Sequence, residues 1–111
     1  MAATGIDLHL EHLKLQFHEA AIEIYQRAID EAGYTAHYFL SMVTEYGGWG
    51  AAKKLLHSEV QSGFTEMYLR GRLDLTLEAL IHDNPIWHPL FTPEELAECE
   101  KRLSDRGYFQ A

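Results

Sequence analysis

Two groups of side chains in this sequence are of types that could do chemistry. The first lies near the N-terminus, where His9 and His12 would share a face if residues 9–12 are helical, and could hold a metal ion with an acid from elsewhere. A catalytic zinc site needs three protein ligands in fixed geometry, and the sequence specifies no third ligand. We therefore expect surface histidines, no metal and no cofactor, and keep a metal site as a weak alternative.

The second group lies in the stretch RGRLDLTLE, where Arg70, Arg72, Asp74 and Glu78 are close in sequence. If this stretch is helical, Asp74 and Glu78 share a face, and two carboxylates can divide acid and base roles in a reaction. Capping of the next helix by Asp74, together with ion pairs to the arginines, explains the same residues without any reaction. A functional role for this cluster stays open, and a small enzyme is the second alternative.

Other catalytic patterns do not occur in the sequence. It has no Gly-rich phosphate loop, no Gly-x-Ser-x-Gly elbow and no His-Glu-x-x-His pair. The single cysteine, Cys99, falls on the apolar face of the last expected helix and is interpreted as a small core residue. One cysteine cannot form an internal disulfide, and neither a signal peptide nor a membrane span is visible. We expect a cytoplasmic protein without membrane contact and, on balance, without catalytic activity.

A double glycine in MVTEYGGWGAAKKLL separates two helical segments and suggests a helix-turn-helix that reads DNA. The second segment offers Lys53, Lys54 and His57 as donors to phosphates or base edges. Nucleic-acid binding draws most of its affinity from clustered cations, whereas this chain of 111 residues has a net charge of −8. We therefore interpret the double glycine as a packing corner, and a nucleic-acid-binding regulator is the first alternative.

The elements that must position these residues are helices almost throughout. Apolar residues recur at helical spacing, and glycines stand where helices need a left-handed residue to end. Helices are expected over residues 17–32, 36–46, 49–57 and 64–83 (in one or two pieces), and from the capping box Thr92-Pro93-Glu94-Glu95 to Gly107. The three prolines of DNPIWHPLFTP forbid a regular helix, so its apolar residues should lie against the core.

The sequence thus predicts an all-α fold, a compact bundle of about five helices with a Pro-rich packed loop before the last one. Residues 17–111 should form a single helical domain, and residues 1–16 an N-terminal arm or an extension of the first helix. Apolar and polar residues alternate in the arm, as in a strand, but no partner strand is expected. The arm carries Leu8, Leu10 and Leu13, which a lone domain would struggle to bury.

Trp49 and Trp87 both lie beside expected helix breaks. Aromatic residues beside helix breaks usually pack over the edge of the hydrophobic core, but tryptophan is also enriched at the centres of protein interfaces. Together with the three leucines of the arm, they are the predicted partner-binding residues. The leading hypothesis is a non-catalytic interaction or regulatory module that binds another protein or itself, with a homodimer as one form.

Residues 17–109 also resemble a widespread family of small bacterial helical proteins of unassigned function. The resemblance is strongest in Gly33-Tyr34, Phe39 with Met42-Val43, Gly47-Gly48 with Ala51-Ala52-Lys53, Gly71-Arg72-Leu73-Asp74-Leu75-Thr76 and Leu90-Phe91-Thr92. It implies a helical fold and a bacterial or phage setting. It brings no catalytic residues.

Overall fold

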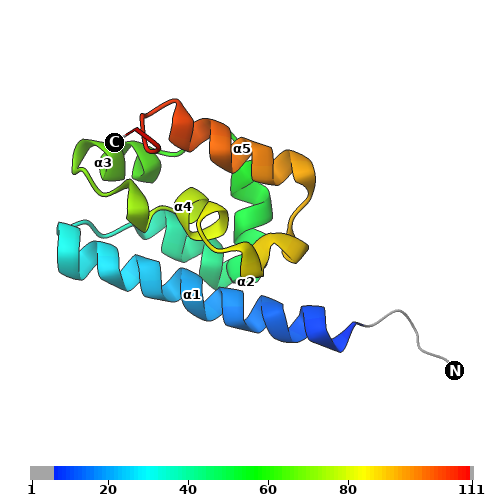
Figure 1. Ribbon diagram of the computed structural model, residues 1–111. Coiled ribbons are helices and arrows are strands. Elements are labelled where there is room, and N and C mark those ends of the chain that lie inside the picture. Colours follow the sequence, from blue (N-terminus) through cyan, green and yellow to red (C-terminus); the bar gives the residue numbers. More distant parts are fainter. Residues whose placement is uncertain (1–6, 111) are drawn as a thin grey trace, which may run out of the picture.

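The computed structural model describes residues 7–110, and within that range every regular element is helical (Figure 1). The elements are α1 (Leu8–Ala32), α2 (His37–Leu56), α3 (Ser62–Leu69), the 3₁₀ helix η1 (Leu73–Leu75), α4 (Leu77–His82), the 3₁₀ helix η2 (Pro85–Leu90) and α5 (Pro93–Ser104). The predicted all-α architecture of about five helices is confirmed. The Pro-rich segment is the short 3₁₀ helix η2, with Pro85 at its first position, where no backbone N–H donor is needed, and Pro89 inside it.

The first helix begins earlier than the apolar pattern of residues 17–32 suggested. The side chain of Asp7 accepts a hydrogen bond from the Leu10 N–H at 3.2 Å, which caps the helix, and Gly33 ends it with a φ of 66°. Residues 8–16 therefore extend the first helix, which was one of the two alternatives predicted for this segment. The arm's first residues, 1–6, lie outside the described part of the chain. The extension forms because Leu13 continues the buried face of Phe17 toward the N-terminus.

The two glycines of the corner in α2 have different reasons to be glycine. Gly47 has a φ of 76° and a ψ of 165°, so it kinks the helix in a conformation that other residues avoid. Gly48 has an ordinary φ, but a Cβ there would lie 2.6 Å from the Cα of His18 in α1. The N–H that the kink frees at Gly48 donates to Nδ1 of His18 at 2.9 Å. The double glycine is thus a corner packed directly against α1.

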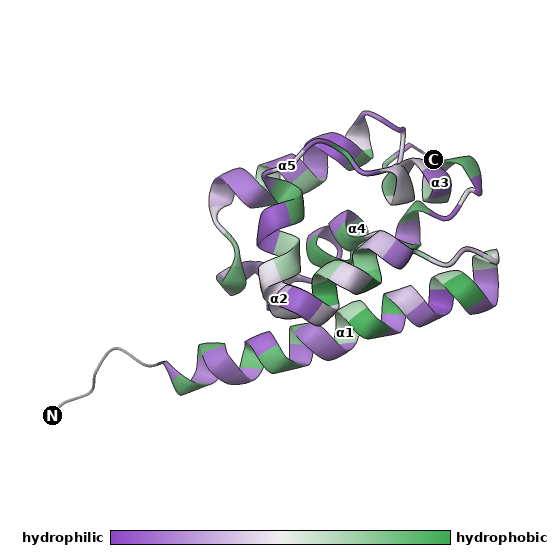
Figure 2. Ribbon diagram, turned by 180° about the vertical axis from the view of Figure 1, so that it is seen from behind, coloured by the Kyte–Doolittle hydropathy of each residue, from purple (hydrophilic) through white to green (hydrophobic). Residues whose placement is uncertain are grey.

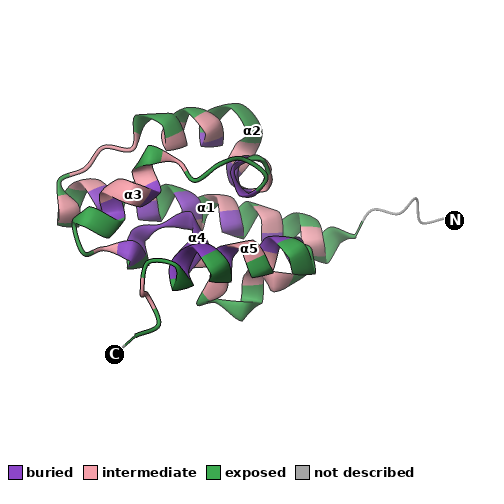
Figure 3. Ribbon diagram, turned by 90° about the horizontal axis from the view of Figure 1, so that it is seen from above, coloured by how far each residue is buried: buried purple, intermediate pink, exposed green. Residues whose placement is uncertain are grey.

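The core lies where α1, α2, α4 and α5 meet, and Figure 3 shows the buried residues gathered there. Phe17 of α1 is fully buried and packs edge-on against Trp87 and Phe91, with ring centroids 5.4 Å apart in both pairs. Figures 1 and 2 show the first turns of α1 projecting beyond the other helices. No helix in residues 7–110 is long and apolar enough to cross a bilayer.

Candidate functional site

The outer row of α1, defined here as Leu8, Leu15 and Ile22, is an exposed apolar surface. These residues recur every seven positions, which places them on one side of the helix, and they are 77%, 67% and 38% exposed. The buried side is formed by another row, which includes Phe17 and Ala21. Figure 2 shows the resulting mixture of hydrophobic and hydrophilic bands along α1. The helix therefore has apolar residues on two opposite sides, and only one of them meets the core.

Acidic side chains surround the outer row. Glu11 and Glu19 lie one helical turn before and after Leu15, and both are exposed. The only lysine of α1, Lys14, is bound to Glu11 at 3.0 Å and lies over the ring of Trp49 at 4.0 Å. Glu19 has no ion-pair partner among residues 7–110. These two carboxylates, called here the acidic rim, lie beside and between the apolar residues of the row, and Glu19 is the one without an ion pair in the described part of the chain.

The predicted partner-binding residues separate into exposed and packed ones. Leu8 is exposed, whereas Leu10 is partly buried against the core and Leu13 is only 3% exposed. Leu13 is therefore corrected to a core residue, because it lies on the inner side of α1. Trp49 and Trp87 are also packed on the core, and the Trp49 indole N–H donates to the Leu90 carbonyl at 2.8 Å. Sequence reasoning missed Leu15 and Ile22, although their spacing from Leu8 was readable.

The Arg70–Glu78 cluster does not form one site. Arg72 donates to Glu31 of α1 at 2.7 Å and to Asp74 at 3.0 Å, at the surface. Arg70 donates to the carbonyl of Ala32 and to its neighbour in α3, Glu66. Glu78 lies elsewhere, buried in α4. The structure does not bring these four side chains together.

The capping assignment in this region also needs correction. Thr76, not Asp74, caps α4, since the Thr76 hydroxyl accepts from the N–H of Ala79 at 3.2 Å. Asp74 belongs to η1 and is separated from α4 by the extended residue Thr76, whose ψ is 158°. Asp74 and Glu78 therefore do not share a helix face, and the expected division of acid and base roles between them has no geometric basis.

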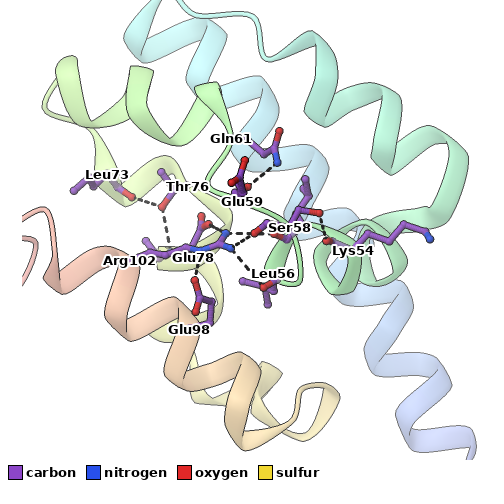
Figure 4. A network of polar contacts seen from close by, with 12 residues as sticks. Lys54, Leu56, Ser58, Glu59, Gln61, Leu73, Thr76, Glu78, Glu98 and Arg102 are labelled. Atoms are coloured by element: carbon purple, nitrogen blue, oxygen red, sulfur yellow. Dashed lines mark hydrogen bonds and ion pairs between the residues drawn. The ribbon is translucent and has the colours of Figure 1, made fainter.

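The buried network centres on Arg102 of α5, a residue that sequence reasoning did not single out (Figure 4). All of its guanidinium N–H groups have acceptors. These are the carboxylates of Glu98 (2.7 Å) and Glu78 (2.9 Å) and the carbonyls of Ser58 (2.6 Å), Leu55 (3.3 Å) and Leu56 (3.5 Å). Arg102 thus joins the end of α2 to α4 and α5. Its position three residues after Cys99, on the buried side of α5, was the available sequence signal.

The environment of Glu78 is unusual for a carboxylate. Burial raises its pKa above the ordinary value, and the hydrogen bond from Arg102 opposes that rise. Two carboxylates, Glu78 and Glu98, meet the single positive charge of Arg102. When both are ionised, the network carries one net negative charge, and part of it is buried.

A cavity of about 90 Å³ opens beside this network, between α1, the start of α2, α3 and α4. Its buried lining includes the apolar residues Ile24, Phe64 and Met67 together with Glu78 and Arg102. Ligand sites for drug-sized molecules span roughly 300–1,000 Å³. The cavity is too small for a nucleotide or a large cofactor and suits only a small molecule.

The three candidate nucleic-acid residues are largely engaged within the protein. Lys53 and His57 both bind the buried carboxylate of Glu95, at 2.6 and 2.8 Å, and Lys54 lies over the ring of Tyr46. Burial alone would raise the pKa of Glu95, but hydrogen bonds from Lys53, from the Thr92 N–H and from His57 lower it below the ordinary value. Glu95 therefore stays ionised and holds two of the three donors that a DNA contact would need.

The remaining chemical candidates are solitary. His9 and His12 are exposed, and residues 7–110 contain no group of three side chains placed to hold a metal ion. Cys99 is fully buried, and burial raises the pKa of its thiol to about 12, so the reactive thiolate is suppressed. The interpretation of Cys99 as a core residue is confirmed.

No family model, no curated protein and no solved structure matches the chain. Its function is therefore inferred from the exposed outer row, the cavity and the polar networks.

Proposed function

We propose that the protein is a non-catalytic, acidic helical module that binds another protein through the outer row of α1. The observation that carries this proposal is the exposure of Leu8, Leu15 and Ile22 on the side of α1 away from the core. Apolar residues that recur every seven positions on one face of a helix are a pattern by which helices bind other helices. On the sequence motifs alone, we also propose the bacterial or phage setting that the family resemblance implies.

The acidic rim defines the chemistry of the partner. A helix that binds a helix is read through apolar positions spaced by three, four or seven residues, and charges beside these positions select the partner. The outer row supplies the apolar positions, and Glu11 and Glu19 supply negative charges beside them. The matching partner is a basic amphipathic helix. A second copy of this chain fits less well, because its own carboxylates would meet those of the first copy.

The experiment uses a synthetic helix with apolar residues at heptad spacing and lysines beside them. Its affinity for the full chain is measured by fluorescence anisotropy, against the same peptide with glutamates in place of the lysines. We expect the basic peptide to bind and the acidic one not to bind. The variant Leu15→Gln/Ile22→Gln should weaken binding roughly tenfold or more, since two buried apolar contacts are lost.

The matched control is Leu69→Gln, because Leu69 in α3 is also 69% exposed but lies outside the outer row. This variant should bind the basic peptide as the unmodified protein does. Equal binding of both peptides, or no effect of Leu15→Gln/Ile22→Gln, would overturn the proposal. Light scattering of the protein without peptide tests whether the outer row binds a second copy of the chain instead. A dimer that becomes monomeric in Leu15→Gln/Ile22→Gln but not in Leu69→Gln would identify the second copy as the partner.

A further inference from the structure

The cavity beside Glu78 is the feature that the proposed interaction surface leaves unexplained. The more exposed part of its lining, called here its mouth, comprises Tyr25, Tyr34, Tyr38 and the start of α3. The cavity meets α1 on the buried side of the helix, opposite the outer row. The buried part of its lining is apolar except for Thr76, Glu78 and Arg102. A ligand in this cavity would therefore keep an apolar body against the walls and a polar end near these three residues.

The hydrogen-bonding state of these residues decides which polar end fits. Arg102 has no donor left, because each of its N–H groups already has an acceptor. The Thr76 hydroxyl donates to the Leu73 carbonyl at 2.7 Å and accepts from the Ala79 N–H. Glu78 accepts one bond from Arg102, and a carboxylate can accept several. The site can therefore take a donor but has nothing to offer an anion.

The charge balance favours a donor that is also a cation. When Glu78 and Glu98 are both ionised, they share the single positive charge of Arg102, which leaves one negative charge in the network. Figure 4 shows Glu78 and Arg102 close to the Ser58–Gln61 segment, which borders the cavity at Gln61. A cation there would balance the charge in a site that is only partly open to water.

We propose that this cavity binds a small primary amine, with its ammonium group on the Glu78 carboxylate and its hydrocarbon part against Ile24, Phe64 and Met67. The volume of about 90 Å³ limits the ligand. An apolar cavity of about 150 Å³ in another protein holds a benzene ring. The enclosed space is smaller than that, so a short alkyl amine fits inside it and a single-ring amine fits only with part of its ring in the open mouth.

The probes are benzylamine, benzyl alcohol and benzoate, which share a ring and differ in the charge of the polar end. Binding to the full chain is followed by the backbone amide shifts of Gly63, Met67 and Thr76 in two-dimensional NMR. For a ligand of this size we expect a Kd for benzylamine of roughly a millimolar. Benzyl alcohol should bind at least tenfold more weakly, and benzoate should cause no saturable shift.

Two variants keep the test decisive even if one of them is unstable. Glu78→Gln removes the charge and should lower the affinity for benzylamine to that for benzyl alcohol. Gly63→Leu fills the mouth and should abolish binding of both, since a Cβ at Gly63 meets nothing closer than 3.8 Å and the larger side chain has room to enter. The control, Leu69→Gln, should change neither affinity.

Several results would overturn the amine site. These are equal binding of the three probes, shifts confined to residues outside the cavity, absence of saturable binding, or undiminished benzylamine binding by Gly63→Leu. The variant Leu15→Gln/Ile22→Gln should bind benzylamine normally, because the outer row does not line the cavity. Failure of the amine site and failure of the interaction surface are therefore distinguishable.

Discussion

Two arginine networks of this protein have the same chemistry in opposite surroundings. Arg102 lies in the interior, with a side chain only 4% exposed, and its partner Glu78 is 7% exposed. Arg72 lies at the surface, 28% exposed, and its partners Glu31 and Asp74 are 38% and 45% exposed. Each arginine joins elements that are distant in sequence, α5 to α4 and α2 in one case and η1 to α1 in the other.

Bond geometry alone does not tell how much an ion pair contributes to stability, as these two networks show. Bond lengths in the two networks are similar, from 2.6 to 3.5 Å around Arg102 and from 2.7 to 3.0 Å around Arg72. At the surface, water and salt replace a lost partner, so the pair contributes little. In the interior, removal of one partner leaves an unpaired charge without water. The buried network should therefore be the more sensitive one.

The largest expected effect comes from Arg102→Met. The change leaves Glu78 buried without its cation and the carbonyls of Leu55 and Ser58 without their donor. We expect the free energy of unfolding to fall by about 3–5 kcal/mol, measured by urea denaturation. Lys101→Met is the control, since Lys101 is an exposed neighbour in the same helix, and it should change stability little. If Arg102→Met lost no more free energy of unfolding than Lys101→Met, the buried network would not be the more sensitive of the two.

A smaller effect of opposite sign is expected when the second charge is also removed. Adding Glu78→Leu to Arg102→Met takes away the uncompensated carboxylate. The double variant should regain about 1–3 kcal/mol relative to Arg102→Met in the same urea measurement. Recovery should be incomplete, because the carbonyls at the end of α2 still lack a donor. Further destabilisation by Glu78→Leu would mean that Glu78 stabilises the fold through contacts other than Arg102.

The two networks should also respond to acid in opposite directions. Hydrogen bonds from Arg27 and Arg72 lower the pKa of Glu31 to about 2, so its stabilisation is present above the ordinary value of 4.5 and is lost as the pH falls toward 2. Burial raises the pKa of Glu78, so its contribution to stability is greatest below 4.5 and declines as the pH rises through the higher, folded value. Urea denaturation of Glu31→Gln and Glu78→Gln is measured between about pH 2.5 and 7. For each variant, the difference in the free energy of unfolding from the unmodified protein is plotted against pH, and its slope reports the contribution of that carboxylate. Slopes of the same sign would contradict this assignment.

The smallest effect is expected for Arg72→Gln. Its ion pairs with Glu31 and Asp74 are exposed, so the loss of stability should be far smaller than for Arg102→Met. The small loss of stability of Arg72→Gln relative to the unmodified protein should vanish in about 1 M salt, where charges are screened over roughly 3 Å. Thermal unfolding at low and high salt checks this. A salt-independent loss would show that Arg72 acts through packing instead of charge.

The sequence was informative about helices and much less so about sites. The end of α1 at Gly33, with a φ of 66°, and the capping box at Thr92 and Glu95 appear as predicted, whereas α5 ends at Ser104, before Gly107. These features depend on residues within one or two turns of each other. The proposed cluster at Arg70–Glu78 failed because it placed Asp74 and Glu78 on one face of the same helix, whereas Asp74 lies in η1 and Thr76 separates it from α4.

The all-α class, several helix ends and the acidic character can be read from the sequence, because caps, periodicity and composition act locally. The contact of Arg102 with Glu78, 24 residues away, and that of Gly48 with His18, 30 residues away, depend on how the helices pack. The way the helices pack also decides that Leu13 lies in the core whereas Leu8 and Leu15 stay exposed. Burial is set by residues that are distant in sequence, which a local sequence pattern does not specify. Because burial also sets the strength of charge interactions, these cannot be read from the local pattern either.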